Sequence, residues 1–160
     1  MAISLHLYSG HMNPDSRLLH LPQSSRYAVT AMFYLASRTD DGYHMVGKIA
    51  RENDLSPSYL SKILQRLAQQ RILDSRRGAK GGYRLGRPAR EITLYDIVAA
   101  SGRAENDPMP CMIEARDCDC ATPCAMHDFV AQTEEAMLRR LSRTTLADFK
   151  QPPLNPGERP

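Results

Sequence analysis

Two short helical patterns separated by a tight turn, between residues 46 and 70, constrain the fold most strongly. Ser56 followed by Pro57 is a strong helix start, because a capping side chain precedes a proline at the first helical position. The apolar residues that follow recur at i, i+3, i+4 and i+7, so they share one face of a helix that runs to about Gln70. This face consists of Leu60, Ile63, Leu64 and Leu67.

The pattern before the turn is shorter. Val46, Ile49 and Ala50 share one side of a helix that ends at the polar residues 52–54. Two short helices around a tight turn form a helix-turn-helix, in which Ser58–Leu67 is the candidate recognition helix. Its short donors and bases suit base edges and phosphates, although an αα-hairpin used only for packing would have the same pattern. The outward residues are Ser58, Ser61, Lys62, Gln65 and Arg66.

A glycine-rich basic segment, residues 76–85, follows this helix and has apolar or aromatic residues on both sides of its tip. This pattern predicts a β-hairpin. A basic hairpin directly after a recognition helix is a wing, which can lay arginines along phosphates or into a minor groove. A nucleotide-phosphate loop is a weak alternative, because the G-x-x-x-x-G-K-[ST] spacing is absent and no Rossmann strand precedes it.

Charge is concentrated in the same region. From Leu55 to Arg90, nine basic residues are opposed only by Asp74, a net charge of +8, whereas the rest of the chain has 12 bases and 17 acids. A solvated face is the ordinary explanation of such a run. Because these bases fall on a predicted helix and wing, we favour a polyanionic partner, double-stranded DNA.

Three further elements complete the predicted winged domain, residues 24–102. A first helix is predicted to begin at Ser24 or Ser25 and to end near Ser37, and Tyr43–Val46 could be a short strand. Thr93 is predicted to cap a helix that ends before Gly102. Residues 1–23 and 148–160 are expected to be a flexible extension and a disordered tail.

A long amphipathic helix is predicted from Pro123 to about Ser142, within a region, 123–147, that we assign to dimerisation. Its apolar stripe has little intrachain core left to cover, so a second copy of the chain is the natural partner. The stripe consists of Met126, Val130, Met137 and Leu141.

All four cysteines fall within fourteen residues, in the loop 103–124 that precedes this helix, and His127 follows the last of them by three positions. Such clustering cannot tie distant parts of a chain together by disulfides. Thiolates beside an imidazole suit zinc, copper(I) or an iron–sulfur cluster, and an inert cysteine cluster is the alternative. The cysteines are Cys111, Cys118, Cys120 and Cys124.

Composition limits the compartment and the class of function. No apolar run approaches the ~18–20 residues needed to span a membrane, and the first residues lack the pattern of a secretory signal. We therefore expect a cytoplasmic protein whose cysteines stay reduced. We predict no catalytic residues.

Four motifs, in this order along the chain, resemble those of the IscR family of dimeric winged-helix transcription regulators. The resemblance spans roughly residues 24–147. The motifs are Arg26-Tyr27-Ala28-Val29-Thr30-Ala31-Met32, Ser58-Tyr59-Leu60, Arg77-Gly78-x-x-Gly81-Gly82-Tyr83-Arg84-Leu85 and Glu91-Ile92-Thr93-Leu94-x-Asp96-Ile97.

The resemblance implies a cluster and a set of DNA contacts. Members with cysteines in this loop hold a [2Fe–2S] cluster or, in relatives that resemble the nitric-oxide sensor NsrR, a [4Fe–4S] cluster. The family's three cysteines and a histidine three residues after the last match Cys111, Cys118, Cys124 and His127, with Cys120 as the alternative to Cys118. The implied DNA-reading residues are Ser58, Ser61 and Lys62, with Arg77 in a minor groove. Arg66 and Lys80 complete our DNA-binding set.

Three departures limit the analogy. The loop has a fourth cysteine, and its first gap is one residue longer than the family's if Cys118 is a ligand. Ser61-Lys62 stands where the family has Glu-Gln, so operator preferences cannot be copied. NsrR-like relatives take an acidic ligand from the first helix, where this chain has Arg26, and this favours His127.

The sequence thus predicts a mostly α-helical protein with a small β-wing: a winged helix-turn-helix domain, a cysteine loop and a long dimerisation helix. We expect a homodimeric regulator that binds a palindromic operator and senses iron–sulfur, redox or nitric-oxide status through a [2Fe–2S] cluster. The alternatives are a small electron-transfer or cluster-carrier protein, which leaves the +8 segment unexplained, and a zinc-stabilised constitutive repressor.

Overall fold

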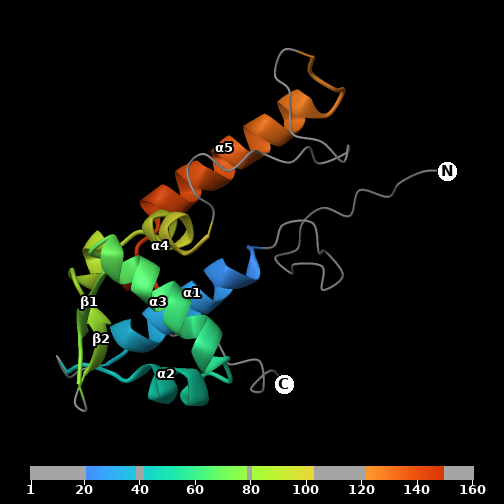
Figure 1. The fold of residues 1–160 in the computed structure, drawn as a ribbon. Coiled ribbons are helices and arrows are strands. Elements are labelled where there is room, and N and C mark those ends of the chain that lie inside the picture. The colour runs from blue at the N-terminus through green and yellow to red at the C-terminus, as the bar shows by residue number, and fades with distance from the viewer. Residues whose placement is uncertain (1–20, 39–41, 79–80, 103–121, 150–160) are drawn as a thin grey trace, which may run out of the picture.

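A computed structural model describes residues 21–38, 42–78, 81–102 and 122–149. Four helices pack together with a two-stranded wing, and a fifth helix projects from the α4 side of this domain (Figure 1). The predicted class, mostly α-helical with a small β-wing, is confirmed. The elements are α1 (Gln23–Ala36), α2 (Val46–Glu52), α3 (Pro57–Gln69), β1 (Leu73–Arg76), β2 (Gly82–Leu85), α4 (Leu94–Ser101) and α5 (His127–Arg143), with 3-10 turns η1 (Ala89–Glu91) and η2 (Leu146–Asp148).

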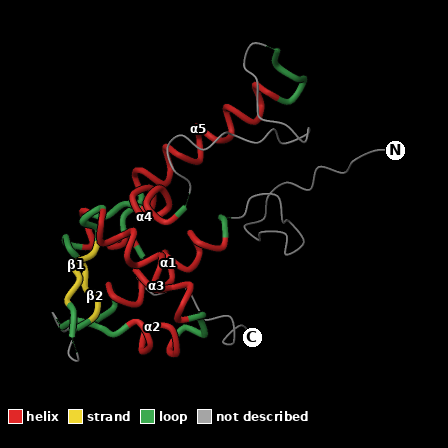
Figure 2. Tube along the Cα trace, viewed as in Figure 1, coloured by secondary structure: helices red, strands yellow, loops and turns green. Residues whose placement is uncertain are grey.

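The core lies between α1 and the elements around it. The α1 helix contacts α2, α3, α4 and β2 (Figure 2). It contributes Ala28, Ala31 and Met32, which are fully buried. The four apolar residues predicted for α3 are at most 1% exposed, so this predicted stripe is confirmed. Burial of these side chains holds the recognition helix against the domain.

The helix-turn-helix has the predicted connection. Asn53 follows the end of α2 and donates through its side chain to Ile49 O at 2.8 Å, while Asp54 has a φ of 51°. Ser56 and Pro57 occupy the cap and first positions of α3, as predicted, although the Ser56 side chain makes no capping hydrogen bond. This turn joins α2 to α3, and the two helices contact each other.

The wing is an antiparallel hairpin in which Leu73 pairs with Leu85 and Arg76 with Gly82. Gly82 has a φ of +147°, and a Cβ there would lie 2.2 Å from the carbonyl oxygen of His44. This close approach allows His44 to form one β-bridge with Tyr83. The strand expected at Tyr43–Val46 is reduced to that bridge, because Val46 already begins α2.

Two predicted helix starts are wrong. The α1 helix begins at Gln23 after Pro22, and Ser25 lies buried inside it, where its hydroxyl accepts a hydrogen bond from Ser101 Oγ at 3.1 Å. The α5 helix begins at His127 rather than at Pro123, because the residues after Pro123 form a turn. By contrast, the predicted cap of α4 is confirmed: Thr93 and Asp96 form a reciprocal capping box.

After α5 the chain returns to the winged domain. Leu94 N donates to Thr144 O at 2.8 Å, and Leu146 N donates to Ile92 O at 3.0 Å. Leu146 is 2% exposed, and the ring of Phe149 lies 4.5 Å from that of Phe33. This return attaches the C-terminal end of α5 to the core.

Candidate nucleic-acid interface

The outer side of α3 presents two rows of polar residues spaced four apart, which places each row along the helix. Every side chain in them is exposed except that of Ser61, which is half-buried. The first row is Ser58, Lys62 and Arg66, and the second is Ser61, Gln65 and Gln69.

The last residue of the first row, Arg66, contacts α4. Arg66 Nη1 donates to the carbonyl oxygen of Ser101 at 3.3 Å. That oxygen belongs to the last turn of α4, whose carbonyls lack partners within their own helix. On the same side of α3, the rings of Tyr59 and Tyr27 meet edge to face at 5.2 Å. Arg66 is therefore partly engaged within the chain, whereas Ser58 and Lys62 face outward.

The wing contains one polar cluster. Tyr43 Oη donates to Asp74 Oδ2 at 2.7 Å, and Arg84 donates to the same oxygen from Nε at 3.1 Å and from Nη2 at 2.9 Å. The hydrogen bonds from Tyr43 and then Arg84 hold the pKa of Asp74 below its usual value. The same bond raises the pKa of Tyr43. The only acid in the basic segment thus pairs with Arg84 at the base of the wing.

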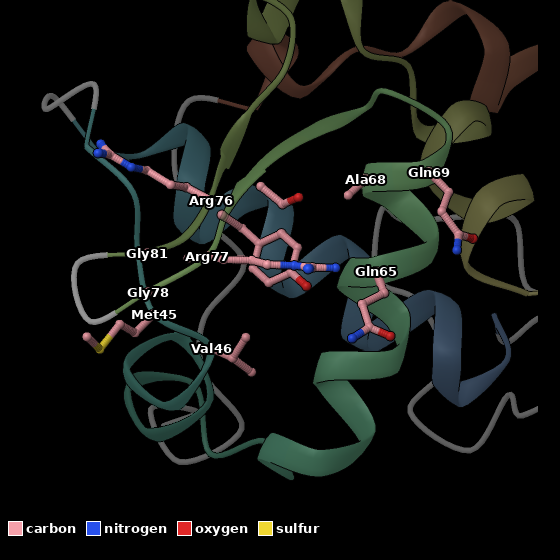
Figure 3. Close-up of a pocket in the computed structure, with 12 residues that line it drawn as sticks. Met45, Val46, Gln65, Ala68, Gln69, Arg76, Arg77, Gly78 and Gly81 are labelled. Atoms are coloured by element: carbon pink, nitrogen blue, oxygen red, sulfur yellow. The ribbon is translucent and has the colours of Figure 1, made fainter.

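A cavity of about 730 Å³ separates the second row of α3 from the wing. Gln65, Ala68 and Gln69 line one side, and Ser75, Arg77 and Gly78 belong to the other. Figure 3 shows the Arg77 side chain crossing the cavity toward Gln65. No Asp or Glu lines it among the described residues, so this groove is open to an anionic chain.

The structure brings most of the predicted DNA-binding residues to one face. Ser58, Ser61 and Lys62 lie on α3, and Arg77 lies in the groove beside it. Lys80 lies outside the described residues. Gln69 and Ser75 also line the groove, and the sequence analysis did not place them there. Gln69 could have been found from the sequence, because it lies four residues after Gln65 and so shares its helix face. The position of Ser75 depends on how the wing folds against α3.

Two of the predicted metal ligands are described. His127 N donates to Cys124 O at 3.0 Å, so a turn brings these residues together where α5 begins. Both are half-buried and lie at the end of α5 farther from α4 (Figure 1). Cys111, Cys118 and Cys120 fall outside the described ranges. Within those ranges, no three His, Cys, Asp or Glu side chains meet in a metal-binding group.

A helix-turn-helix, a basic wing and a groove between them define the winged-helix class of DNA-binding proteins. The chain belongs to the Rrf2 family, whose members are described as iron-dependent transcriptional regulators; the family model matches residues 21–152. It is therefore a DNA-binding transcription regulator.

Individual relatives agree with this assignment. IscR of Photobacterium profundum is 32% identical over 131 residues, which are 82% of this chain and 75% of that protein. CymR, the global cysteine regulator of B. subtilis, has a TM-score of 0.64 at 29% identity, covering 82% of this chain and 95% of CymR. T. potens IscR has a TM-score of 0.62 at 27% identity, covering 81% and 85%. The IscR-like character predicted from sequence is confirmed.

Within the described residues, no helix is both long enough and apolar enough to cross a membrane.

Proposed function

We propose that this regulator is a homodimer that responds to iron–sulfur, redox or nitric-oxide status through a [2Fe–2S] cluster. The observation that carries the proposal is the Cys124–His127 turn. This backbone turn brings residues 124 and 127 together, three further cysteines precede them in sequence, and the family is described as iron-dependent.

The donor set fits such a cluster. Thiolates and imidazole are the side chains that bind iron in [2Fe–2S] centres, and a cluster supplies reversible one-electron chemistry and sensitivity to small oxidants. We assign Cys111, Cys118, Cys124 and His127 as ligands, with Cys120 in place of Cys118 as the alternative. A change in cluster occupancy is expected to alter operator affinity by ~1–3 kcal/mol, the usual size of such coupling.

The decisive experiment is anaerobic purification followed by visible absorption spectroscopy and analysis of iron and sulfide. About two irons and two sulfides per chain, with charge-transfer bands, support [2Fe–2S]; four of each indicate [4Fe–4S]. Zinc without sulfide would contradict the proposal and favour a zinc-stabilised constitutive repressor.

Single substitutions separate the ligands. Cys120→Ala should keep the absorption and EPR signals of the reconstituted cluster, whereas Cys118→Ala should lose them. The reverse result would exchange the two assignments. An unchanged spectrum for His127→Ala would remove the histidine from the ligand set.

The exposed face of α5 supports homodimerisation. No residue of this helix is buried within the described chain, and Phe129 and Leu138 are 62% and 41% exposed. Met126 and Met137, from the predicted stripe, are also exposed. A palindromic operator then follows from the symmetry of two identical recognition helices.

Substitutions in α3 and the wing test the DNA contacts. Lys62→Ala should alter preference at one major-groove position by ~1–3 kcal/mol, whereas Arg77→Ala should weaken binding chiefly at A·T-rich minor-groove steps. The same set includes Ser58, Ser61, Arg66 and Lys80. The affinity for DNA should fall steeply as the salt concentration rises, because several basic side chains contact phosphates. Equal, sequence-independent losses from both substitutions would contradict these roles.

The likeness to CymR favours a second candidate, in which the response is to cysteine status and requires no iron. Protein purified anaerobically without iron or sulfide, but with operator binding that changes on addition of cysteine, would support this candidate instead.

A further inference from the structure

We propose that Gln65 and Gln69 are specificity-determining residues that read bases in the major groove, and that the groove beside them holds the sugar–phosphate strand between the two DNA grooves. The proposal rests on DNA binding by α3 and the wing, and it does not depend on a cluster.

Both glutamines are placed for base recognition. They lie one helical turn apart on the side of α3 that faces the wing, and both side chains are exposed. Neither amide has a hydrogen-bond partner among the described residues, in contrast with Arg66 on the other row. A glutamine amide donates and accepts at once, which matches the N7 and N6 groups of adenine in the major groove.

The spacing of the two residues limits the sequence that they can read. An α-helix rises 1.5 Å per residue, so four residues span about 6 Å. Base pairs are stacked about 3.4 Å apart along a strand. A helix lying along the major groove would therefore present Gln65 and Gln69 to positions about two base-pair steps apart, each expected to favour adenine.

The groove next to these glutamines suits one DNA strand. A recognition helix in the major groove and a wing at the adjacent minor groove necessarily have one sugar–phosphate strand between them. The Ser75 hydroxyl lines the groove opposite Gln65 and can donate to phosphate, and the Arg77 guanidinium adds positive charge on the same side. The cavity of about 730 Å³ has two arginines and a serine on its wing side and no acid among its described lining residues.

The chain provides a matched control for the glutamines. Gln70 is also exposed, but it is the C-terminal capping residue of α3 and does not line the groove. Gln70→Ala removes the same amide from the same helix without touching the proposed contact.

The experiment is selection of preferred operators from random duplexes by the full-length protein, using wild type, Gln65→Ala, Gln69→Ala and Gln70→Ala. Each of the first two variants should lose an adenine preference at one position in each half-site, and the two positions should lie about two steps apart. The matching loss of affinity for the wild-type sequence should be about 5- to 150-fold, from ~1–3 kcal/mol for one bidentate contact. Gln70→Ala should select the wild-type sequence.

A second measurement tests whether the groove holds a sugar–phosphate strand. Ethylation of individual phosphates should show one whose modification blocks wild-type binding but has less effect on Ser75→Ala, and that phosphate should lie between the major- and minor-groove contacts.

If both Gln65→Ala and Gln69→Ala select the wild-type operator sequence, these glutamines do not read bases. The same conclusion follows if Gln70→Ala changes the selected sequence as much as they do. If no phosphate depends on Ser75, the assignment of the groove to a DNA strand fails, and a small polar ligand becomes its expected occupant. Each measurement is repeated on protein freed of iron. An absent cluster therefore contradicts the proposed sensing function while leaving this inference open to the same tests.

Discussion

The helices α3 and α5 have similar amphipathic sequences but opposite surroundings. On α3, Leu60, Leu64 and Leu67 have no exposed surface, because α1, α2 and α4 cover them. On α5 no described residue is buried, and Phe129 remains mostly exposed. An apolar stripe therefore indicates that a face is to be covered, and it does not indicate whether the same chain or another copy covers it.

The largest effect is expected from a change in the covered stripe. Leu64→Ala removes a fully buried side chain from α3 and leaves a cavity, which should lower the free energy of unfolding by ~2–5 kcal/mol. Chemical denaturation measures this loss. A decrease below ~1 kcal/mol would mean that the α3 face is less closely packed than the structure indicates.

A change in the uncovered stripe should affect assembly instead of folding. Met137→Asp places a charge on the exposed α5 face, so we expect monomers with unchanged helical content. Sedimentation and far-ultraviolet circular dichroism measure the two quantities, and Val130→Asp should behave alike. The control is Gln132→Asp, which adds the same charge at an exposed polar position. If Met137→Asp stays fully dimeric, the interface lies elsewhere.

The smallest effect is expected at the half-buried polar cluster of Tyr43, Asp74 and Arg84 beside the wing. Tyr43→Phe removes the main hydrogen bond that lowers the pKa of Asp74, so this pKa should rise toward its usual value. Because the folded-state pKa of Asp74 is depressed, its contribution is present above the unfolded-state pKa and is lost as the pH falls through the folded one. The substitution should therefore narrow the pH range, between the folded-state and unfolded-state pKa of Asp74, over which this contribution to stability is lost.

Titration of the Asp74 carboxyl carbon by NMR measures this pKa, and Tyr95→Phe on α4 serves as a control at a tyrosine outside the cluster. An unchanged pKa in Tyr43→Phe would show that Arg84 alone accounts for the shift.

Sequence reasoning was most successful where local chemistry decides the structure. The Ser56-Pro57 start, the apolar face of α3 and the Thr93–Asp96 capping box each depend on residues within a turn or two of one another. Thr122-Pro123 has the same local signal as Ser56-Pro57, yet α5 begins at His127. Proline is also common in turns, so the signal alone does not distinguish the two outcomes.

The remaining differences depend on tertiary contacts. Ser25 is buried and hydrogen-bonded to Ser101, 76 positions away, and a helix-capping rule considers only neighbouring residues. The groove beside Gln69 likewise exists only because β1 and β2 fold back toward α3. For the candidate metal site, the resemblance to the IscR family supplies the ligand assignment, and the structure adds the turn between Cys124 and His127.

The return of the chain after α5 has a consequence for the order of folding. Leu146 enters the core of the winged domain and its backbone pairs with Ile92, which lies more than fifty positions earlier. When Gly102, at the end of α4, has left the ribosome, the domain therefore still lacks part of its core. It must wait for the cysteine segment and the whole of α5, because contacts distant in sequence form only after the intervening chain is available. All four cysteines are therefore synthesised before the DNA-binding domain has finished folding.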